Sequence, residues 1–383
     1  MHKGNMLIVH GGAPTAVMNA SLFGAIKAAQ KSGSVAKIYG ARNGLGALLQ
    51  DDFINLSKLP DETLNKLPHT PASFIGTSRY PVSGEGYDKI VDKLVEHDIE
   101  FLLFNGGNGS MDACGKIVAA LQRNSKAKGI RVIGIPKTMD NDIAVTDHSP
   151  GFGSAARYLA ASVQELSRDL AALPIHVCIV ESMGRNSGWL TAAAALADRG
   201  PHLIYVPELL FDEDSFLEKA KSLYEQFGGV LVVASEGLKG LDGATLVPPI
   251  FQVGRSVYYG DVSAHLCNLV IKKLGIKARS EKPGILGRCS IAHQSVVDRD
   301  EAILAGTEAA KAALGGQTGA MVGFKRISDK PYLAETFLIP VEEVMLHEKV
   351  LPKRYLCSEG KGITQEYIDW CRPLIGGELA DFA

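Results

Sequence analysis

The sequence lacks the features that mark secreted, membrane-spanning or nucleic-acid-binding proteins. Its 40 lysines and arginines are balanced by 42 aspartates and glutamates, so there is no basic excess to attract a nucleic acid. Its six cysteines have no CxxC spacing, which disfavours zinc ribbons and disulfide frameworks and fits a reducing compartment. No apolar run has the length that a bilayer requires. We therefore expect a soluble, cytoplasmic protein with no membrane and no nucleic-acid partner.

A globular composition and a recurring order of strand, loop and helix indicate an α/β fold. The 383 residues are 46% hydrophobic and 21% charged, which is enough for two domains or one large α/β unit with a sizeable core. Short apolar runs, such as 6–9, 101–104 and 130–135, alternate with stretches of helical periodicity. This alternation is typical of parallel sheets, which place their chemistry at the carboxyl ends of the strands.

The most informative stretch follows the apolar run 130–135, which we expect to be a buried strand that ends at Pro136. Two carboxylates, a lysine and a hydroxyl come next, in Lys137, Thr138, Asp140 and Asp142. This set suits phosphoryl transfer, because one carboxylate can accept a proton from an attacking hydroxyl, the other can lie near a metal, and the lysine can neutralise phosphate charge. A solvated turn has a similar composition, so this stretch alone leaves both interpretations open.

Two glycine-rich turns, His10–Thr15 and Asn105–Ser110, each connect an expected strand to an expected helix. Backbone N–H groups at such a turn can face an anion, and glycine lets a phosphate approach closely. Each turn alone is a weak signal, since a tight βα connection looks the same. Arg79, near a pair of hydroxyls, is either a surface residue or a phosphate ligand. Two such turns together with the 134–142 stretch are rarer by chance than any one of them.

Comparable polar residues occur later in the chain. Gly184 and Arg185 follow one apolar run, and Glu236 follows another. Arg279 and Arg288 concentrate positive charge around a Pro-Gly turn. We expect Gly184, Arg185 and Glu236 to belong to a second α/β region.

In their order along the chain, these motifs resemble the phosphofructokinase family over nearly the whole sequence. The Pro-Lys-Thr-x-Asp-Asn-Asp run at 136–142 is highly specific for that family. The tail Arg372–Gly377 is most similar to the pyrophosphate-using branch. The other matching segments are Gly11–Thr15, Gly76–Arg79, Gly106–Ser110, Met183–Arg185 and Glu236.

The resemblance implies a role for each matching residue. Asp140 would take the proton from the sugar 1-hydroxyl, and Asp142 would support it near a Mg²⁺ ion. Thr138 and Lys137 would contact the transferred group, with its charge balanced by Arg79 and Arg185. The donor would be bound by Gly11, Gly12, Arg79, Gly107, Asn108, Gly109 and Ser110. The sugar phosphate would be bound by Thr138, Asp140, Met183, Gly184, Arg185, Glu236, Arg279 and Arg288.

Three departures from the family pattern affect these expectations. Asn108 stands where the family usually has an aspartate near the metal, so Asn108 and Asp142 would hold Mg²⁺ weakly. His176 stands where an arginine often binds the 6-phosphate, and histidine is only partly charged at neutral pH. Lys137 favours pyrophosphate as donor, whereas Gly109 leaves room for ATP, because the family's pyrophosphate enzymes usually carry an aspartate there.

We therefore predict two doubly wound, Rossmann-like lobes of mostly parallel sheet, with helices on both faces and the active site between the lobes. Residues 1–150 with roughly 287–345 would form the phosphoryl-donor lobe, 151–286 the sugar-phosphate lobe, and 346–383 a C-terminal extension. The predicted reaction is phosphoryl transfer from pyrophosphate to fructose 6-phosphate in glycolysis, by a homodimer or homotetramer. The alternatives are ATP as donor, another sugar phosphate such as sedoheptulose 7-phosphate, or a regulatory sugar-phosphate-binding protein without activity.

Overall fold

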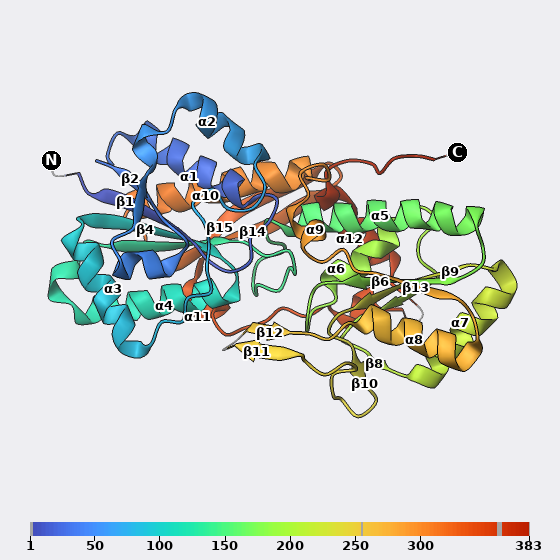
Figure 1. Ribbon diagram of the computed structural model, residues 1–383. Helices are drawn as coiled ribbons and strands as arrows, with labels where there is room; N and C mark the ends of the chain where they lie inside the picture. Colours follow the sequence, from blue (N-terminus) through green and yellow to red (C-terminus); the bar gives the residue numbers. More distant parts are fainter. Residues whose placement is uncertain (1–2, 254–255, 358–361, 383) are drawn as a thin grey trace. The chain divides into compact units, whose positions relative to one another are not determined.

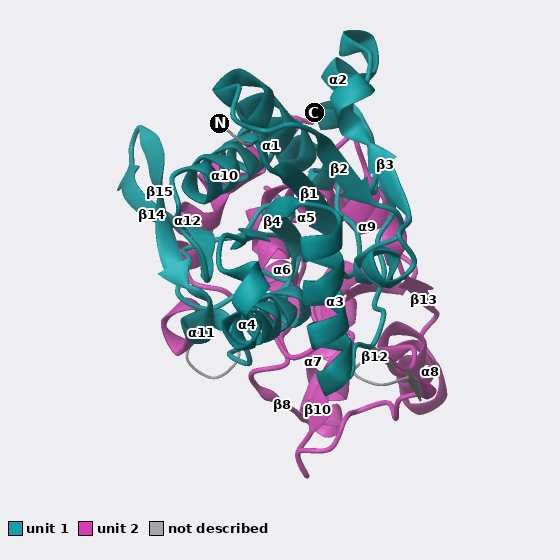
Figure 2. Cartoon of the chain, turned by 90° about the vertical axis from the view of Figure 1, so that its left-hand side faces the viewer, with its two compact units in different colours: residues 1–152, 296–349 teal, residues 153–295, 350–383 magenta. Residues whose placement is uncertain are grey.

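The computed structural model describes residues 3–253, 256–357 and 362–382, and the chain divides into two compact units (Figures 1 and 2). Unit 1 holds residues 1–152 and 296–349, and unit 2 holds residues 153–295 and 350–383. These boundaries differ from the predicted ones, mainly because residues from 350 onward group with unit 2. The assignment of a donor lobe and a sugar-phosphate lobe stays a prediction.

Unit 1 is built on a seven-stranded sheet in the order β15-β14-β5-β4-β1-β2-β3. The strands β14, β5, β4, β1 and β2 run parallel, and the two edge strands β3 and β15 are antiparallel to their neighbours. Their bounds are β1 (Asn5–His10), β2 (Ile38–Ala41), β3 (Phe53–Asn55), β4 (Ile99–Gly106), β5 (Arg131–Pro136), β14 (Ala320–Asp329) and β15 (Tyr332–Pro340).

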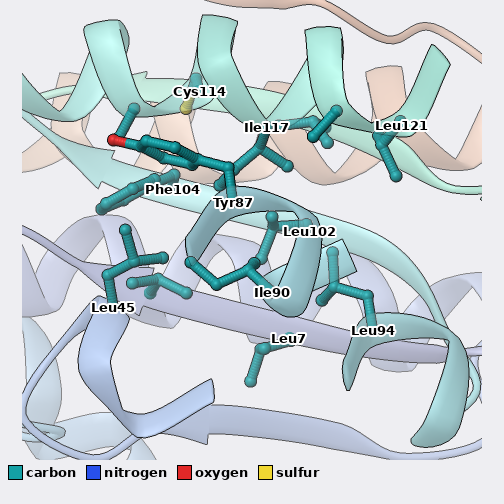
Figure 3. Close-up of a cluster of buried hydrophobic side chains, with 14 of the residues drawn as sticks. Leu7, Leu45, Tyr87, Ile90, Leu94, Leu102, Phe104, Cys114, Ile117 and Leu121 are labelled. Atoms are coloured by element: carbon teal, nitrogen blue, oxygen red, sulfur yellow. The ribbon is translucent and has the colours of Figure 1, made fainter. Parts of the chain in front are cut away.

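Helices cover both faces of this sheet because its central strands are apolar on both sides. Leu7 of β1 packs toward α3 (Gly84–Glu96) and α4 (Asn108–Arg123), as Figure 3 shows. Ile8, one residue on, points to the opposite face, toward α1 (Met18–Ser32) and α10 (Val296–Leu314). In α4 the buried apolar residues recur every three or four positions, at Met111, Cys114, Ile117 and Leu121.

Unit 2 contains a four-stranded parallel sheet in the order β13-β6-β9-β7. Its core includes residues of α7 and α8, such as Phe216 and Leu266, against Ile179 and Val232 of the sheet. The strands are β6 (Val177–Ser182), β7 (Leu203–Tyr205), β9 (Val230–Ser235) and β13 (Ala278–Glu281). The helices are α5 (Phe152–Ala172), α6 (Trp189–Ala192), α7 (Glu213–Phe227), α8 (Val262–Leu274), α9 (Ile285–Cys289) and α12 (Gln365–Cys371).

Shorter elements complete the chain. Unit 1 also has α2 (Asp61–Lys66), α11 (Val341–Val344) and the 3₁₀ helices η1 (Leu45–Leu49), η2 (Leu56–Lys58), η3 (Leu67–His69) and η4 (Ser125–Ala127). Unit 2 also has β8 (Leu210–Phe211), β10 (Lys239–Gly240), β11 (Phe251–Val253), β12 (Ser256–Tyr258), η5 (Ala193–Leu196), η6 (Lys353–Tyr355) and η8 (Arg372–Ile375).

The predicted fold class, two α/β units with mostly parallel sheets, is confirmed. The expected strands at 6–9, 101–104 and 130–135 are the cores of β1, β4 and β5. The β14–β15 hairpin did not emerge from the sequence pattern. Among the described residues, the six cysteines form no disulfide, and no helix has both the length and the apolar character needed to cross a membrane.

Candidate active site

The two glycine turns and the 136–142 segment meet at one edge of the unit 1 sheet. They follow β1, β4 and β5, which are neighbouring parallel strands and therefore end on the same side. The Gly11 N–H donates to the Asn105 carbonyl at 2.9 Å, and the Lys137 N–H donates to the Gly106 carbonyl at 3.0 Å. The geometry thus brings together three segments of which the first and the last, at Gly11 and Lys137, are 126 positions apart in the chain.

Close packing of these turns requires glycine at specific positions. A Cβ on Gly11 or on Gly106 would overlap the Ser110 hydroxyl. Gly107 precedes α4, so the first N–H groups of that helix, at Asn108 and Gly109, point away from the helix, an arrangement that can bind an anion. A Cβ on Gly109 would have no heavy atom within 4 Å, which means that the position borders open space.

Lys137 supplies a buried positive charge beside the first turn. Its side chain is only 5% exposed, and its ammonium donates to the Ala13 carbonyl at 2.6 Å. His10 lies nearby and is fully buried, and this burial together with the charge of Lys137 lowers the pKa of His10 to about 3. His10 is therefore neutral at physiological pH and adds no positive charge to that of Lys137.

The loop after β5 places two carboxylates at this edge of the sheet. Thr138 is fixed by its N–H, which donates to the Pro150 carbonyl at 3.1 Å, and its Oγ1 accepts the Asp140 N–H at 3.0 Å. Asn141 then turns the chain in the left-handed region, with φ of 52°. As a result Asp140 and Asp142 are both only partly buried, while Asn141 between them is fully buried.

Asn108 and Asp142 form the donor set that could hold a metal. The Asn108 Nδ2 donates to the Asp142 Oδ2 at 3.0 Å and to the Asp142 carbonyl at 3.1 Å. Both partners are acceptors, so the amide nitrogen faces them, and Asn108 Oδ1 points elsewhere. Asn108 Oδ1 and Asp142 Oδ1 are buried and have no hydrogen-bond partner among the described residues. Unpaired amide and carboxylate oxygens are ligands of the type that a hard divalent cation such as Mg²⁺ prefers.

Arg79 follows a segment that is tied to the first glycine turn. The Gly12 N–H donates to the Ser78 carbonyl at 2.9 Å, and Thr77 Oγ1 donates to the Gly12 carbonyl at 2.8 Å. Gly12 has φ of 75°, a conformation that favours glycine. Arg79, an exposed residue, directly follows Ser78, whose carbonyl binds the first glycine turn.

Unit 2 assembles its own polar cluster at the carboxyl ends of β6 and β9. The Glu236 N–H donates to the Ser182 carbonyl at 2.9 Å, and the Gly184 N–H approaches Glu236 Oε1 at 3.3 Å. Arg185 adopts φ of 49°, and a Cβ on Gly237 would overlap its carbonyl. Met183, directly before Gly184, is partly buried in the same loop.

Arg279 lies away from this cluster. It pairs with Cys178 in the β13–β6 register, five residues before Met183, which corresponds to roughly 16 Å along a strand. Arg288 lies on α9 and is only partly exposed. His176 is 6% exposed just before β6, and burial together with the charge of Arg279 lowers its pKa, which favours the neutral imidazole.

One site-forming residue had no signal in the sequence. Lys349, more than 200 residues after the 136–142 segment, binds the loop that follows Asp140 through backbone and side-chain hydrogen bonds. Its neighbours in the chain form no recognisable motif, so only the three-dimensional structure could identify it.

A helix N-terminus, a buried lysine and two carboxylates at one sheet edge are together typical of phosphotransferases. The comparisons with known proteins agree with this class. The profile of the family described as phosphofructokinase matches residues 5–313. The chain therefore belongs to the phosphofructokinase family, whose phosphotransferases generally use a divalent metal.

Individual relatives span almost the full chain. A pyrophosphate–fructose 6-phosphate 1-phosphotransferase of Xanthomonas campestris pv. campestris is 36% identical, covering 99% of this chain and 93% of that protein. A sulfofructose kinase of Alkalicoccus urumqiensis is 35% identical, covering 96% and 94%. The crystal structure of a pyrophosphate-dependent phosphofructokinase from Marinobacter aquaeolei superposes with a TM-score of 0.89 at 33% identity, covering 99% of this chain and 94% of that chain.

Proposed function

We propose that this protein transfers a phosphoryl group from pyrophosphate to the 1-hydroxyl of fructose 6-phosphate, giving fructose 1,6-bisphosphate in cytoplasmic glycolysis. The observation that carries the proposal is the loop of Thr138, Asp140 and Asp142, which packs with Lys137 against both glycine turns. The names of the Xanthomonas and Marinobacter relatives support pyrophosphate as the donor.

In this proposal unit 1 binds the donor and supplies the base. Asp140 accepts the proton of the sugar 1-hydroxyl while the hydroxyl oxygen forms a bond to the phosphorus of the donor. The bridging P–O bond of the donor breaks at the same time and releases phosphate. Lys137, Arg79 and Arg185 balance the charge on the migrating group, and the N–H groups at the start of α4 bind its oxygens. A Mg²⁺ ion held by Asn108 and Asp142 would neutralise further phosphate charge when bound.

Unit 2 is assigned to the sugar phosphate. Met183, Gly184 and Glu236 would contact the sugar ring. Arg279 is roughly 16 Å along the strand from Met183, too far to share one small ligand with it in the same chain. We therefore propose that Arg279 binds the 6-phosphate held by another subunit, which requires a homodimer or homotetramer, and that Arg288 binds the 6-phosphate as well.

ATP is the second candidate donor, because Gly109 borders open space and adds no charge. A different acceptor is also consistent with His176, which is neutral where the family often has an arginine. A sulfonate carries one negative charge, whereas a phosphate monoester carries up to two, so fewer cations suit a sulfonate better. The sulfofructose kinase relative makes sulfofructose the specific alternative to test.

A coupled assay with the purified protein tests the proposal. Pyrophosphate and ATP are compared at fixed fructose 6-phosphate, then each donor with sulfofructose and sedoheptulose 7-phosphate. We expect the highest kcat/KM with pyrophosphate and fructose 6-phosphate. Higher kcat/KM with ATP or with another acceptor would replace the corresponding part of the proposal. Absence of turnover with every pair would favour a regulatory binding protein instead.

A further inference from the structure

The segment that follows α11 contacts the loop that carries Asp140. Glu348 pairs with Ile143 in an isolated antiparallel bridge. One residue further, the Lys349 N–H donates to the Asp142 carbonyl at 2.8 Å. A strand-like backbone contact thus joins the loop to a segment that is distant in sequence.

The side chain of Lys349 extends this contact along the loop. Its Nζ donates to the carbonyls of Thr146 and Asp147, both at 2.9 Å, and lies 3.4 Å from Asn141 Oδ1. An ammonium group has three N–H donors, and these three oxygens surround it. Bonds from a charged donor are stronger than bonds between neutral groups. Burial lowers the pKa of Lys349 to about 8, and Asp147 and Asp142 oppose that shift.

The loop needs such a partner because its backbone is strained. Asn141 has φ of 52° and Val145 has φ of 70°. The left-handed region is unfavourable for a β-branched residue such as Val145. Conformations of this kind persist only when the surrounding structure holds them in place.

The far end of the loop is held independently of Lys349. Thr146 Oγ1 accepts the Phe324 N–H at 2.8 Å and donates to the His148 carbonyl at 2.8 Å. Lys349 therefore connects this fixed end to the turn at Asn141, which lies directly between the two carboxylates.

We propose that Lys349 is a positioning residue for the phosphoryl-transfer step, acting through the backbone on the placement of Asp140 and Asp142. The inference rests on the proposed function. The contacts described above for Lys349 are all with the loop, so its effect on the reaction is indirect. Without its ammonium, the turn at Asn141 relaxes toward ordinary backbone angles and moves the Asp140 carboxylate away from the acceptor hydroxyl.

The variant Lys349→Met tests this, with Lys325→Met, at an exposed lysine of β14, as the matched control. Activity is measured per folded protein with the donor and acceptor that give wild-type turnover. We expect kcat to fall by roughly 10- to 100-fold, since small misplacements of a catalytic group have effects of that size. We expect the KM for the sugar phosphate to change less than about threefold, because only Thr138 and Asp140 of its proposed ligands belong to this loop and the others lie in unit 2.

Hydrogen–deuterium exchange gives a readout that does not depend on activity. Amides of residues 138–148 should exchange faster in Lys349→Met, while those of the first glycine turn should not change. If Lys349→Met does not fold, Lys349→Gln, which keeps an amide donor, carries the same comparisons. Wild-type kcat in these variants, or a rise in KM with kcat unchanged, would overturn the inference. Wild-type protein that is inactive with every donor would refute the proposed function, whereas unchanged exchange in residues 138–148 would refute only the role of Lys349.

Discussion

The replacement Gly109→Asp tests how the chain selects its phosphoryl donor. Gly109 is in the first turn of α4, has no neighbouring heavy atom within 4 Å of an added Cβ, and does not have a positive φ. An aspartate in the first turn of a helix is favourable and replaces a weak helix former. The variant should therefore fold at least as well as the wild type, so a change in activity reports on the donor.

The size of the effect follows from the electrostatics of the turn. A carboxylate placed about 5 Å from a nucleotide α-phosphate, at an effective dielectric constant of about 20, repels it by about 3 kcal/mol, or roughly a hundredfold in kcat/KM. Pyrophosphate has no third phosphoryl group to occupy that space. We expect Gly109→Asp to suppress any ATP activity by roughly that factor and to leave pyrophosphate activity within about threefold of wild type.

The assay is steady-state kinetics with each donor at saturating fructose 6-phosphate. Gly109→Ala is the matched control, because it adds the Cβ without the charge and should affect neither donor strongly. Equal loss with both donors in Gly109→Asp would refute the reasoning. Retained ATP activity would show that the α-phosphate does not approach this position.

Two further predictions concern the metal and the pH dependence of stability. Asn108→Asp adds an anionic oxygen beside Asp142, so it should lower the Mg²⁺ concentration for half-maximal activity, whereas Asn108→Ala should raise that concentration. An unchanged concentration in both variants would exclude this pair as the metal site. Burial alone would lower the pKa of His148, but its contacts with Glu301 Oε2 at 2.7 Å and Asp147 Oδ2 at 2.8 Å outweigh burial and raise the pKa from 6.5 to about 9. Because folding raises this pKa, protonated His148 stabilises the folded state by about 3 kcal/mol. This contribution is fully present below pH 6.5 and is lost as the pH rises through about 9. Urea unfolding across this range should show a smaller alkaline decline in His148→Gln than in the wild type, and equal declines would contradict the assignment.

Much of unit 1 could be predicted because its signals are local. Pro136 ends the strand that its preceding apolar run predicts. Gly11 and Gly107, which follow the first and the second apolar run, permit a tight turn into a helix. Parallel strands end on one side, so the meeting of these turns follows from topology alone. The β14–β15 hairpin gave no such signal, because β15 alternates between exposed and only partly buried positions, and the exposed ones include apolar side chains such as Leu333 and Phe337.

Other parts of the site depend on register and on distant contacts. The nine-residue spacing of Arg279 and Arg288 could not reveal that Arg279 pairs with Cys178, away from Met183. Lys349 contacts a loop about 200 residues earlier in the chain, and no local pattern encodes such a contact.

The central claim is that Asp140 accepts the proton of the attacking hydroxyl, and Asp140→Asn tests it most directly. The amide keeps the size of the side chain but cannot act as a base at neutral pH. We predict that kcat falls by about 10²- to 10⁴-fold while the KM for the sugar phosphate and the unfolding midpoint change little. Turnover near the wild-type rate in correctly folded Asp140→Asn would contradict the account.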